Sequence, residues 1–385
     1  MKLIFNVKDK PSFGKVVVFA IQQLLAIMAA TLVVPVIING NVFNLIKEGA
    51  ITWEFTTQMS PAAALFGAGV GTIVYLLFTK FKSPVFLGSS FAFLPSMTAA
   101  FAGAVSMSIG YLGLIIGAVF AGLVYVAISI AVKFAGTSWI NKVMPAVVIG
   151  PTVAIIGLCL AGNAVGDLQT ASAGGDSRIA ILVGLVTLVV TMICSVYAKK
   201  KSMFRLIPFI IGILAGYVFG AILTVIGSAT GAKELMIINF DPLKELVAGG
   251  VGVKTFLTFP DFTFLNIKDG FTTLTNNWGY LGTIAMAYVP VAFVVFAEHI
   301  ADHKNLSSII GSDLTEDPGL HRTLLGDGVG SMAGAFFGGC PNTAYGESIG
   351  CVAISGNASV ITVFVTAILA ILVSFVGPFA TFLAT

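Results

Sequence analysis

Residues 88–95 read GSSFAFLP, and they interrupt an apolar run that extends from Val85 to Ala102. Small polar residues and a proline disfavour an unbroken helix. A similar interruption, PNTAYGE at residues 341–347, lies in a later apolar run. In membrane transporters, hydrophobic segments broken at corresponding positions of two halves indicate a binding site near the bilayer midplane. Either interruption alone is compatible with a turn or a helix-packing position, so the prediction depends on the pair.

The composition around these interruptions is that of a membrane protein. Hydrophobic residues make up 57% of the chain and charged residues 10%, and the mean hydropathy is +1.01. Soluble proteins carry about 25% charged residues. We therefore predict an all-α polytopic membrane protein that is embedded in a lipid bilayer. The formal net charge of +3 is attributed to basic inner loops rather than to binding of nucleic acid.

Eleven apolar runs are candidates for membrane segments, and a long polar connection from Gly227 to Tyr280 separates the first seven from the last four. The runs are Val16–Ile38, Pro61–Phe78, Val85–Ala102, Leu112–Val132, Val143–Ala161, Ile179–Val196, Leu206–Ile226, Leu281–Ile300, Leu324–Phe337, Ala344–Ile354 and Val360–Leu383.

The distribution of lysine and arginine predicts a cytoplasmic N-terminus. With that orientation fourteen basic residues lie inside and six outside, which is the positive-inside bias of membrane proteins. The inner residues are Lys2, Lys8, Lys10, Lys15, Lys80, Lys82, Lys133, Lys142, Lys199, Lys200, Lys201, Arg205, Lys304 and Arg322.

Seven runs before the long connection is an odd number, so the second set enters the membrane from the opposite side. That is the condition for an inverted repeat. By this count three segments are missing after Thr385. We expect either an asymmetric repeat or a truncated chain.

Ionisable residues stand together in FAEHIADH, residues 296–303, at the end of an apolar run. Placing such groups at membrane depth costs roughly 2.5 to 3.5 kcal/mol each on insertion scales, which indicates function. Glu298 and Asp302 lie four residues apart and share a helix face. His299 and His303 form a second pair that is rotated by one residue, so we expect supporting roles for the histidines and no metal site.

Glu298 has an alternative reading as a helix-end acid at the cytoplasmic interface. A functional role requires its helix to continue past Asp302 to Ile310, which brings Glu298 nearer the middle. Two other polar sets are assigned structural roles. Gln22 and Gln23 are expected to form hydrogen bonds between helices, and Asp317–Arg322, DPGLHR, is expected to form a turn and a helix start.

The two broken segments predict the chemistry of the ligand. Helix starts near Phe91 and Gly346 would present free amide donors to carbonyl or anionic oxygens. Glu298 and Glu347 would accept hydrogen bonds, and Phe91 or Tyr345 offers a ring for stacking. A planar molecule with alternating N–H and C=O groups fits this set, and a nucleobase is such a molecule.

A carboxyl group in a low-dielectric environment binds a proton more readily than one in water. Glu298 or Glu347 could therefore exchange a proton at physiological pH, with Asp302 as a relay, and a proton gradient would drive uptake without another cofactor. The chain contains no GxxxxGK, HExxH or GxSxG motif. These absences count against ATP drive and against a hydrolytic enzyme, and we predict a transporter.

Four motifs in this order resemble the nucleobase–ascorbate transporter family, and within it the bacterial uracil permeases. They are GSSFAF at 88–93, AEH at 297–299, DPGLHR at 317–322 and PNTAYGE at 341–347. The resemblance implies seven plus seven segments in two inverted repeats, of which about eleven are present here. It also implies that the third and tenth segments each begin as a short strand.

The same resemblance implies domain boundaries. Residues 15–135 would form the first part of a core domain, 143–227 the first part of a gate domain, 228–280 an extracellular loop, and 281–385 the second part of the core domain. The last three gate segments would be absent.

The function implied is proton-coupled uptake of a nucleobase, most plausibly uracil, across the bacterial cytoplasmic membrane by alternating access. Other purine bases such as xanthine or uric acid, or an anion carried by the same architecture, remain alternatives, and family members often form homodimers. The substrate-binding residues implied are Glu298, Glu347, Phe91, Ala92, Gly346 and Tyr345, and the proton-coupling residues are Glu298, Asp302 and Glu347. A glutamate at position 347 is similar to the uracil type, whereas xanthine-type members usually have glutamine there.

Three departures from the family pattern qualify these implications. The signature after Glu347 differs, because Ser348–Gly350 and Ser355–Gly356 replace Asn-x-Gly and a final threonine. Asp302 stands where uracil permeases often have histidine, so the resemblance implies a proton relay that is built differently here. We also expect a chain that ends at Thr385 to fold much of its core and to transport poorly or not at all.

Overall fold

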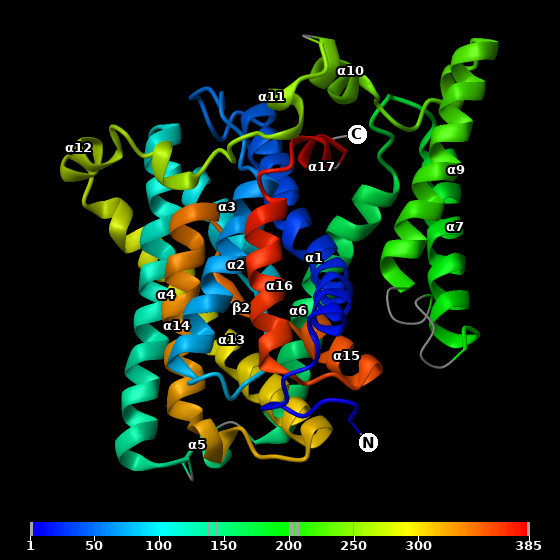
Figure 1. Ribbon diagram of the computed structural model, residues 1–385. Coiled ribbons are helices and arrows are strands. Elements are labelled where there is room, and N and C mark those ends of the chain that lie inside the picture. The colour runs from blue at the N-terminus through cyan, green and yellow to red at the C-terminus, as the bar shows by residue number, and fades with distance from the viewer. Residues whose placement is uncertain are drawn as a thin grey trace. The chain divides into compact units, whose positions relative to one another are not determined.

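A computed structural model describes residues 3–137, 139–143, 145–199, 204, 208–248 and 250–382 (Figure 1). Several positions named above lie outside these ranges: Lys2, Lys200, Lys201, Arg205, Leu206, Leu383 and Thr385. The chain divides into two compact units. The first contains Met1–Ala154 and Phe259–Ser374, and the second contains Ile155–Thr258 and Phe375–Thr385.

Long apolar helices make up most of the first unit. They are α1 (Phe13–Lys47), α2 (Pro61–Phe78), α4 (Met107–Ala135), α13 (Gly279–Ile310), α14 (Leu320–Gly338) and α16 (Val360–Val373). Together with α7 (Ser177–Val196) and α9 (Pro208–Thr230) of the second unit, α1, α2, α4 and α13 are the six helices in the described ranges that are long and apolar enough to cross a membrane. The all-α membrane class is confirmed.

The two interrupted runs are broken helices. Strand β1 (Leu87–Ser89) is followed by the 3-10 helix η1 (Phe91–Phe93) and by α3 (Leu94–Ala102). Strand β2 (Asn342–Ala344) is followed by α15 (Gly346–Ser355). The short strands that the resemblance implied in these two segments are therefore present, and both belong to the first unit.

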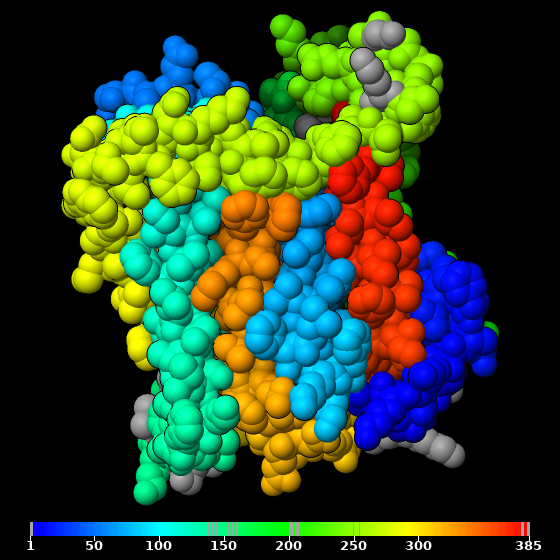
Figure 2. Space-filling view, turned by 60° about the vertical axis from the view of Figure 1, so that its left-hand side comes forward, coloured from blue at the N-terminus to red at the C-terminus, as the bar shows by residue number. Residues whose placement is uncertain are grey.

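Helices α2 and α14 pack closely beside these strands. Figure 2 shows α4, α14, α2 and α16 side by side on one face, and each neighbouring pair is in contact. The close approach of α2 and α14 depends on glycine, because a Cβ atom on Gly67 would lie 2.4 Å from the Gly334 carbonyl oxygen. Small residues at such a crossing let helix backbones meet at van der Waals distance.

The N-terminal residues pair with the connection between α15 and α16. Phe5 forms a parallel bridge with Asn357. The amides of Ile4 and Ala358 donate to the carbonyls of Gly356 and Phe5, at 2.7 and 2.9 Å. Backbone groups that lie outside helices are thereby satisfied next to the C-terminal end of α15.

One predicted segment is wrong. The run Val360–Leu383 is not a single span, because α16 ends at Val373 and a separate helix, α17 (Gly377–Phe382), follows. Pro378 has no amide hydrogen to donate to a helical hydrogen bond, so α16 does not continue through it. The boundary between the two units also falls here, after Ser374.

The second unit contains α7 and α9, which contact each other, and most of the long polar connection. That connection forms short helices: η2 (Lys233–Leu235), α10 (Asp241–Ala248), α11 (Val253–Phe256) and, within the first unit, η3 (Thr263–Leu265) and α12 (Gly270–Thr275). Two further helices precede α7, namely α5 (Ile140–Val143) and α6 (Ala146–Leu168).

Candidate functional site

The two short strands pair with each other in the interior of the first unit. They are antiparallel, with Leu87 opposite Ala344, Gly88 opposite Thr343 and Ser89 opposite Asn342. All six residues are buried. Two segments more than 250 residues apart in sequence therefore meet at their broken points.

Side chains from neighbouring helices satisfy the outer edges of this pair. The Thr72 hydroxyl of α2 accepts a hydrogen bond from the Leu87 amide at 2.9 Å. On the other strand, the Ser331 hydroxyl of α14 accepts from the Asn342 amide at 3.0 Å. Polar backbone at membrane depth is tolerated where protein groups pair with it, which is the arrangement seen here.

Tyr345 fastens the two broken segments together. Its amide donates to the Phe86 carbonyl at 3.1 Å, and its hydroxyl donates to the Ser89 carbonyl at 2.7 Å. The ring lies over Gly88, where a Cβ atom would be 2.3 Å from ring carbons. Tyr345 is only 4% exposed, so its side chain lies between the strands and is not an open ring face.

The helix starts lie directly after the strands. Phe91 and Ala92 begin η1 and are half-buried. Gly346 and Glu347 occupy the first turn of α15 and are exposed, and open space surrounds the position of a Cβ atom on Gly346. The first amides of a helix have no acceptor within it, so these two starts present donors and positive dipole ends.

Helix α13 brings the predicted acids to these starts. It contacts η1, β2 and α15, and it extends to Ile310, as a functional role for Glu298 requires. Glu298 and Asp302 are both half-buried. Glu347 is a charged neighbour of each of them. The structure thus brings Glu298, Asp302 and Glu347 near enough for each to interact electrostatically with the other two.

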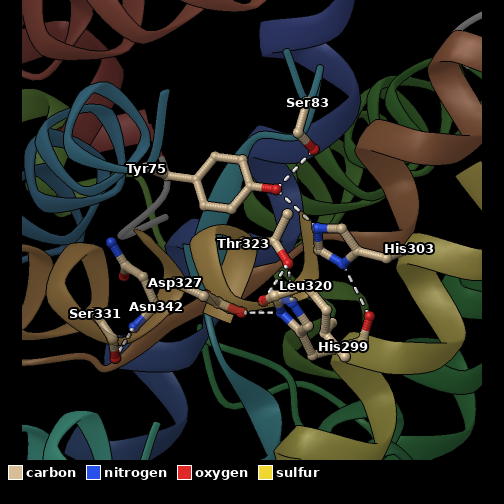
Figure 3. Close-up of polar contacts among 9 residues, drawn as sticks. All are labelled: Tyr75, Ser83, His299, His303, Leu320, Thr323, Asp327, Ser331 and Asn342. Carbon is tan, nitrogen blue, oxygen red and sulfur yellow. Dashed lines mark hydrogen bonds and ion pairs between the residues drawn. The ribbon is translucent and has the colours of Figure 1, made fainter. Parts of the chain in front are cut away.

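A buried histidine–carboxylate pair lies beside this cluster (Figure 3). His299 Nδ1 is 2.6 Å from Asp327 Oδ2, and His299 Nε2 is 3.1 Å from the Thr323 hydroxyl. The two paired side chains are 0% and 1% exposed. The backbone amide of Ala344 in β2 also interacts with the Asp327 carboxyl group.

The second histidine belongs to a separate hydrogen-bonded group. His303 Nδ1 donates to the His299 carbonyl at 2.8 Å, and His303 Nε2 is 2.7 Å from the Tyr75 hydroxyl. That hydroxyl is also 2.7 Å from the Ser83 hydroxyl. These side chains are fully buried and link α13 to α2 and to the segment before β1 (Figure 3).

Sequence reasoning missed Asp327. Its signal was present, because an aspartate within the apolar run Leu324–Phe337 is an ionisable residue at membrane depth. Asp327 lines a cavity of about 10 Å³ together with Tyr125 and Thr343. Its Oδ1 atom and the Tyr125 hydroxyl are both buried without a hydrogen-bond partner.

The structural roles assigned to other polar residues are confirmed. Gln23 Nε2 of α1 donates to the Ser348 hydroxyl of α15 at 2.8 Å, and that hydroxyl also accepts from the Phe86 amide. Residues 317–319 form part of a turn of helix, η4 (Thr315–Gly319), and α14 begins at Leu320.

In the part of the chain that the structure describes, no group of three or more His, Cys, Asp or Glu side chains could hold a metal ion.

Comparison with known proteins identifies close similarity to transporters. A family model described as the Permease family matches residues 14–385. The uracil permease of Bacillus caldolyticus is 35% identical over 377 residues, which cover 98% of this chain and 75% of the relative. The uracil permease of Bacillus subtilis is 34% identical, with the same coverages. That of Escherichia coli K12 is 32% identical over 97% of this chain and 74% of the relative.

The transmembrane domain of a cyanobacterium bicarbonate transporter, BicA, has a similar solved structure. The TM-score is 0.50 with 14% sequence identity, over 94% of this chain and 87% of that chain. At this identity the likeness concerns the fold alone.

Proposed function

We propose uracil as the substrate of this chain, which belongs to the permease family and is similar to bacterial uracil permeases over nearly its whole length. The chain is a multi-pass membrane permease and not an enzyme. Uptake of uracil by alternating access is the function that its site supports best.

One observation carries the assignment of the site. Two helix starts, at Phe91 and Gly346, emerge from one pair of strands and both contact the helix that holds Glu298. Uracil presents N–H and C=O groups alternately around one ring. Free amides at the helix starts can donate to its carbonyl oxygens, while Glu298 and Glu347 accept from its N–H groups.

The half-buried Phe91 is the ring placed to stack on the base, with Ala92 beside it. Tyr345 contributes differently, because its side chain is held between the strands. We infer that it shapes the site by fixing Gly88 and Gly346, a role that differs from the stacking that the sequence analysis offered for it.

We further propose that uptake is coupled to protons through Glu298, Asp302 and Glu347, without another cofactor. The support is their shared environment, in which Glu347 is a charged neighbour of both Glu298 and Asp302. The same proposal includes an inverted repeat of core and gate segments, a cytoplasmic N-terminus in a bacterial inner membrane, and a homodimer.

Uptake of radiolabelled uracil into cells that lack their own uracil permease tests this function. Saturable uptake that a protonophore abolishes is the expected result, and excess unlabelled xanthine should compete poorly. Glu298→Gln should abolish uptake, while Glu245→Gln, at an exposed position of α10, should not change it. Strong competition by xanthine would make a purine base the substrate. Unchanged uptake and pH dependence in Glu298→Gln would refute the assignment of that residue.

A further inference from the structure

The contact between His299 and Asp327 joins two helices at the level of the proposed site. His299 follows Glu298 directly on α13, and Asp327 lies in the middle of α14. The 2.6 Å separation of Nδ1 and Oδ2 is short even for a hydrogen bond to a charged group. Neither the ligand chemistry nor the carboxylate cluster described above accounts for this pair.

Hydrogen-bond directions determine how many protons the pair holds. The Thr323 hydroxyl donates to the Leu320 carbonyl at 3.0 Å, so its oxygen is left to accept from His299 Nε2. His299 Nε2 therefore carries a hydrogen. Between Nδ1 and Asp327 Oδ2 there must be a second hydrogen, since two lone pairs at 2.6 Å would repel. The pair thus holds two protons and has no net charge, whichever atom carries the shared one.

The neighbouring histidine is consistent with this count. His303 Nδ1 faces the His299 carbonyl and must donate to it. A neutral His303 satisfies its other contact by accepting at Nε2 from the Tyr75 hydroxyl, which in turn accepts from the Ser83 hydroxyl. Its ring stacks on the ring of His299 with centroids 3.9 Å apart, an arrangement that two imidazolium cations would oppose.

Removal of the shared proton would change the geometry. The Nδ1 lone pair would face a carboxylate, and the buried pair would carry a net negative charge in a low-dielectric interior. Other acidic groups oppose that charge from several elements. The titratable groups that interact electrostatically with Asp327 are Glu298 and Asp302 on α13, Tyr75 on α2 and Tyr125 on α4. Glu347 on α15 is a charged neighbour of both Glu298 and Asp302, and His303 on α13 stacks on His299.

We propose that the shared proton of His299 and Asp327 holds α13 against α14 and β2 in the arrangement that binds substrate. His299 and Asp327 are thus positioning residues for Glu298 and for the start of α15, which follows β2. Loss of the proton separates the two helices and releases the base. This inference rests on the proposed function, and it adds to Glu298, Asp302 and Glu347 a proton-dependent contact that lies outside the ligand shell.

Asparagine at position 327 distinguishes this role from others. Its amide group has the shape of a protonated aspartate and can donate to Nδ1, but it cannot lose that hydrogen at accessible pH. Asp327→Asn should therefore fix the contact in its proton-loaded form. A variant that removes the donor altogether, Asp327→Ala, should lose the contact at every pH.

The experiment measures binding of radiolabelled uracil to the purified full chain in lipid nanodiscs, from about pH 6 to about pH 9. This range extends above the ordinary titration of histidine because loss of the shared proton would leave a net negative charge in the interior. The affinity of the wild type should fall about tenfold or more across this range. The affinity of Asp327→Asn should stay within about threefold of the wild-type value at low pH and should fall less than that of the wild type as the pH rises. Asp241→Asn, an equivalent change at an exposed residue of α10, should follow the wild type.

Two results would overturn the proposal. If Asp327→Asn binds no uracil at any pH while remaining folded, the carboxylate itself is needed. If it follows the pH profile of the wild type, the proton that matters lies elsewhere. Thermal unfolding without uracil, measured on the same samples, gives an independent readout. The unfolding midpoint should fall at high pH in the wild type and not in Asp327→Asn, and equal falls would also contradict the proposal.

Failure of the proposed function gives a different pattern. In that pattern the wild type binds no uracil at any pH, while its unfolding midpoint falls at high pH and that of Asp327→Asn does not. Such a result would reject uracil as the substrate. It would support the proton-dependent contact.

Discussion

The Tyr345 hydroxyl donates to the Ser89 carbonyl at 2.7 Å, so the residue that precedes α15 closes the pair of short strands. Because Tyr345 also caps the start of α15, the strand pairing and the position of that helix start depend on each other. A change in one broken segment is therefore transmitted to the other through the Tyr345 side chain as well as through the strand pairing.

Gly88→Ala should disrupt this arrangement. The new methyl group would lie 2.3 Å from the Tyr345 ring, and both side chains are enclosed. Overpacking of this kind costs roughly 1 to 3 kcal/mol. A lower thermal unfolding midpoint in detergent is expected. Gly346→Ala is the matched control, since its methyl group would enter open space and should leave the midpoint unchanged. Equal midpoints for the two variants would argue against the strand packing.

Ser348→Ala should destabilise the junction between α15 and β1. The hydroxyl of Ser348 accepts hydrogen bonds from Gln23 Nε2 and from the Phe86 amide, and all three groups are buried. Leaving buried donors unpaired costs about 1 to 3 kcal/mol each. Ser308→Ala removes an exposed hydroxyl from α13 and serves as the control. Chemical denaturation of both purified variants would show whether only the first loses stability.

Tyr75→Phe and Ser83→Ala should have effects that are not additive. Tyr75 is hydrogen-bonded to both His303 and Ser83, so its removal already breaks the contact that Ser83→Ala would break. A double-mutant cycle on unfolding free energy should give a coupling of about 0.5 to 3 kcal/mol. Tyr197→Phe, at a residue that is 82% exposed, should have no effect. Additive losses would mean that the two hydroxyl groups act separately.

Deletion of residues 1–9 should loosen the connection between α15 and α16. Phe5 accepts a hydrogen bond from the Ala358 amide, and Val7 accepts one from the Val360 amide. Without these partners, both amides should exchange hydrogen for deuterium faster, as mass spectrometry of peptides from this region can measure. Peptides from α7, which belongs to the other unit, should be unaffected. Unchanged exchange at residues 358–360 would contradict this expectation.

The sequence predicted the broken helices well because their signal is local. Glycine, serine, asparagine and proline clustered within an apolar run disfavour an unbroken span, and β1 and β2 lie in the two interrupted runs. The condition set for a functional role of Glu298, a helix that continues to Ile310, is met, although the predicted run ended at Ile300 and residues 302–308 are mostly polar. The roles of Glu298, Glu347 and Phe91 in binding remain predictions.

What sequence reasoning could not supply was the partner of each polar group. His299 and Asp327 are 28 positions apart on different helices, and no spacing rule joins them. Tyr345 was expected to offer a ring to the ligand, but its position over Gly88 follows from strand register, which is a tertiary property. The last apolar run was read as one span because hydropathy outweighed the Gly377–Pro378 signal that ends it.

The pairing of β1 with β2 also sets an order of events during synthesis. Ser89 emerges 256 residues before Tyr345, and Asp9 emerges 350 residues before Ser359. Until the later segments arrive, the backbone groups on one edge of β1 have no partner from β2, in a lipid environment that offers none. Closure of such long loops is slow, since chain entropy must be lost before any contact is gained. We therefore expect the site to be among the last parts of the first unit to assemble, with the Thr72 hydroxyl as the partner of the Leu87 amide before β2 is in place.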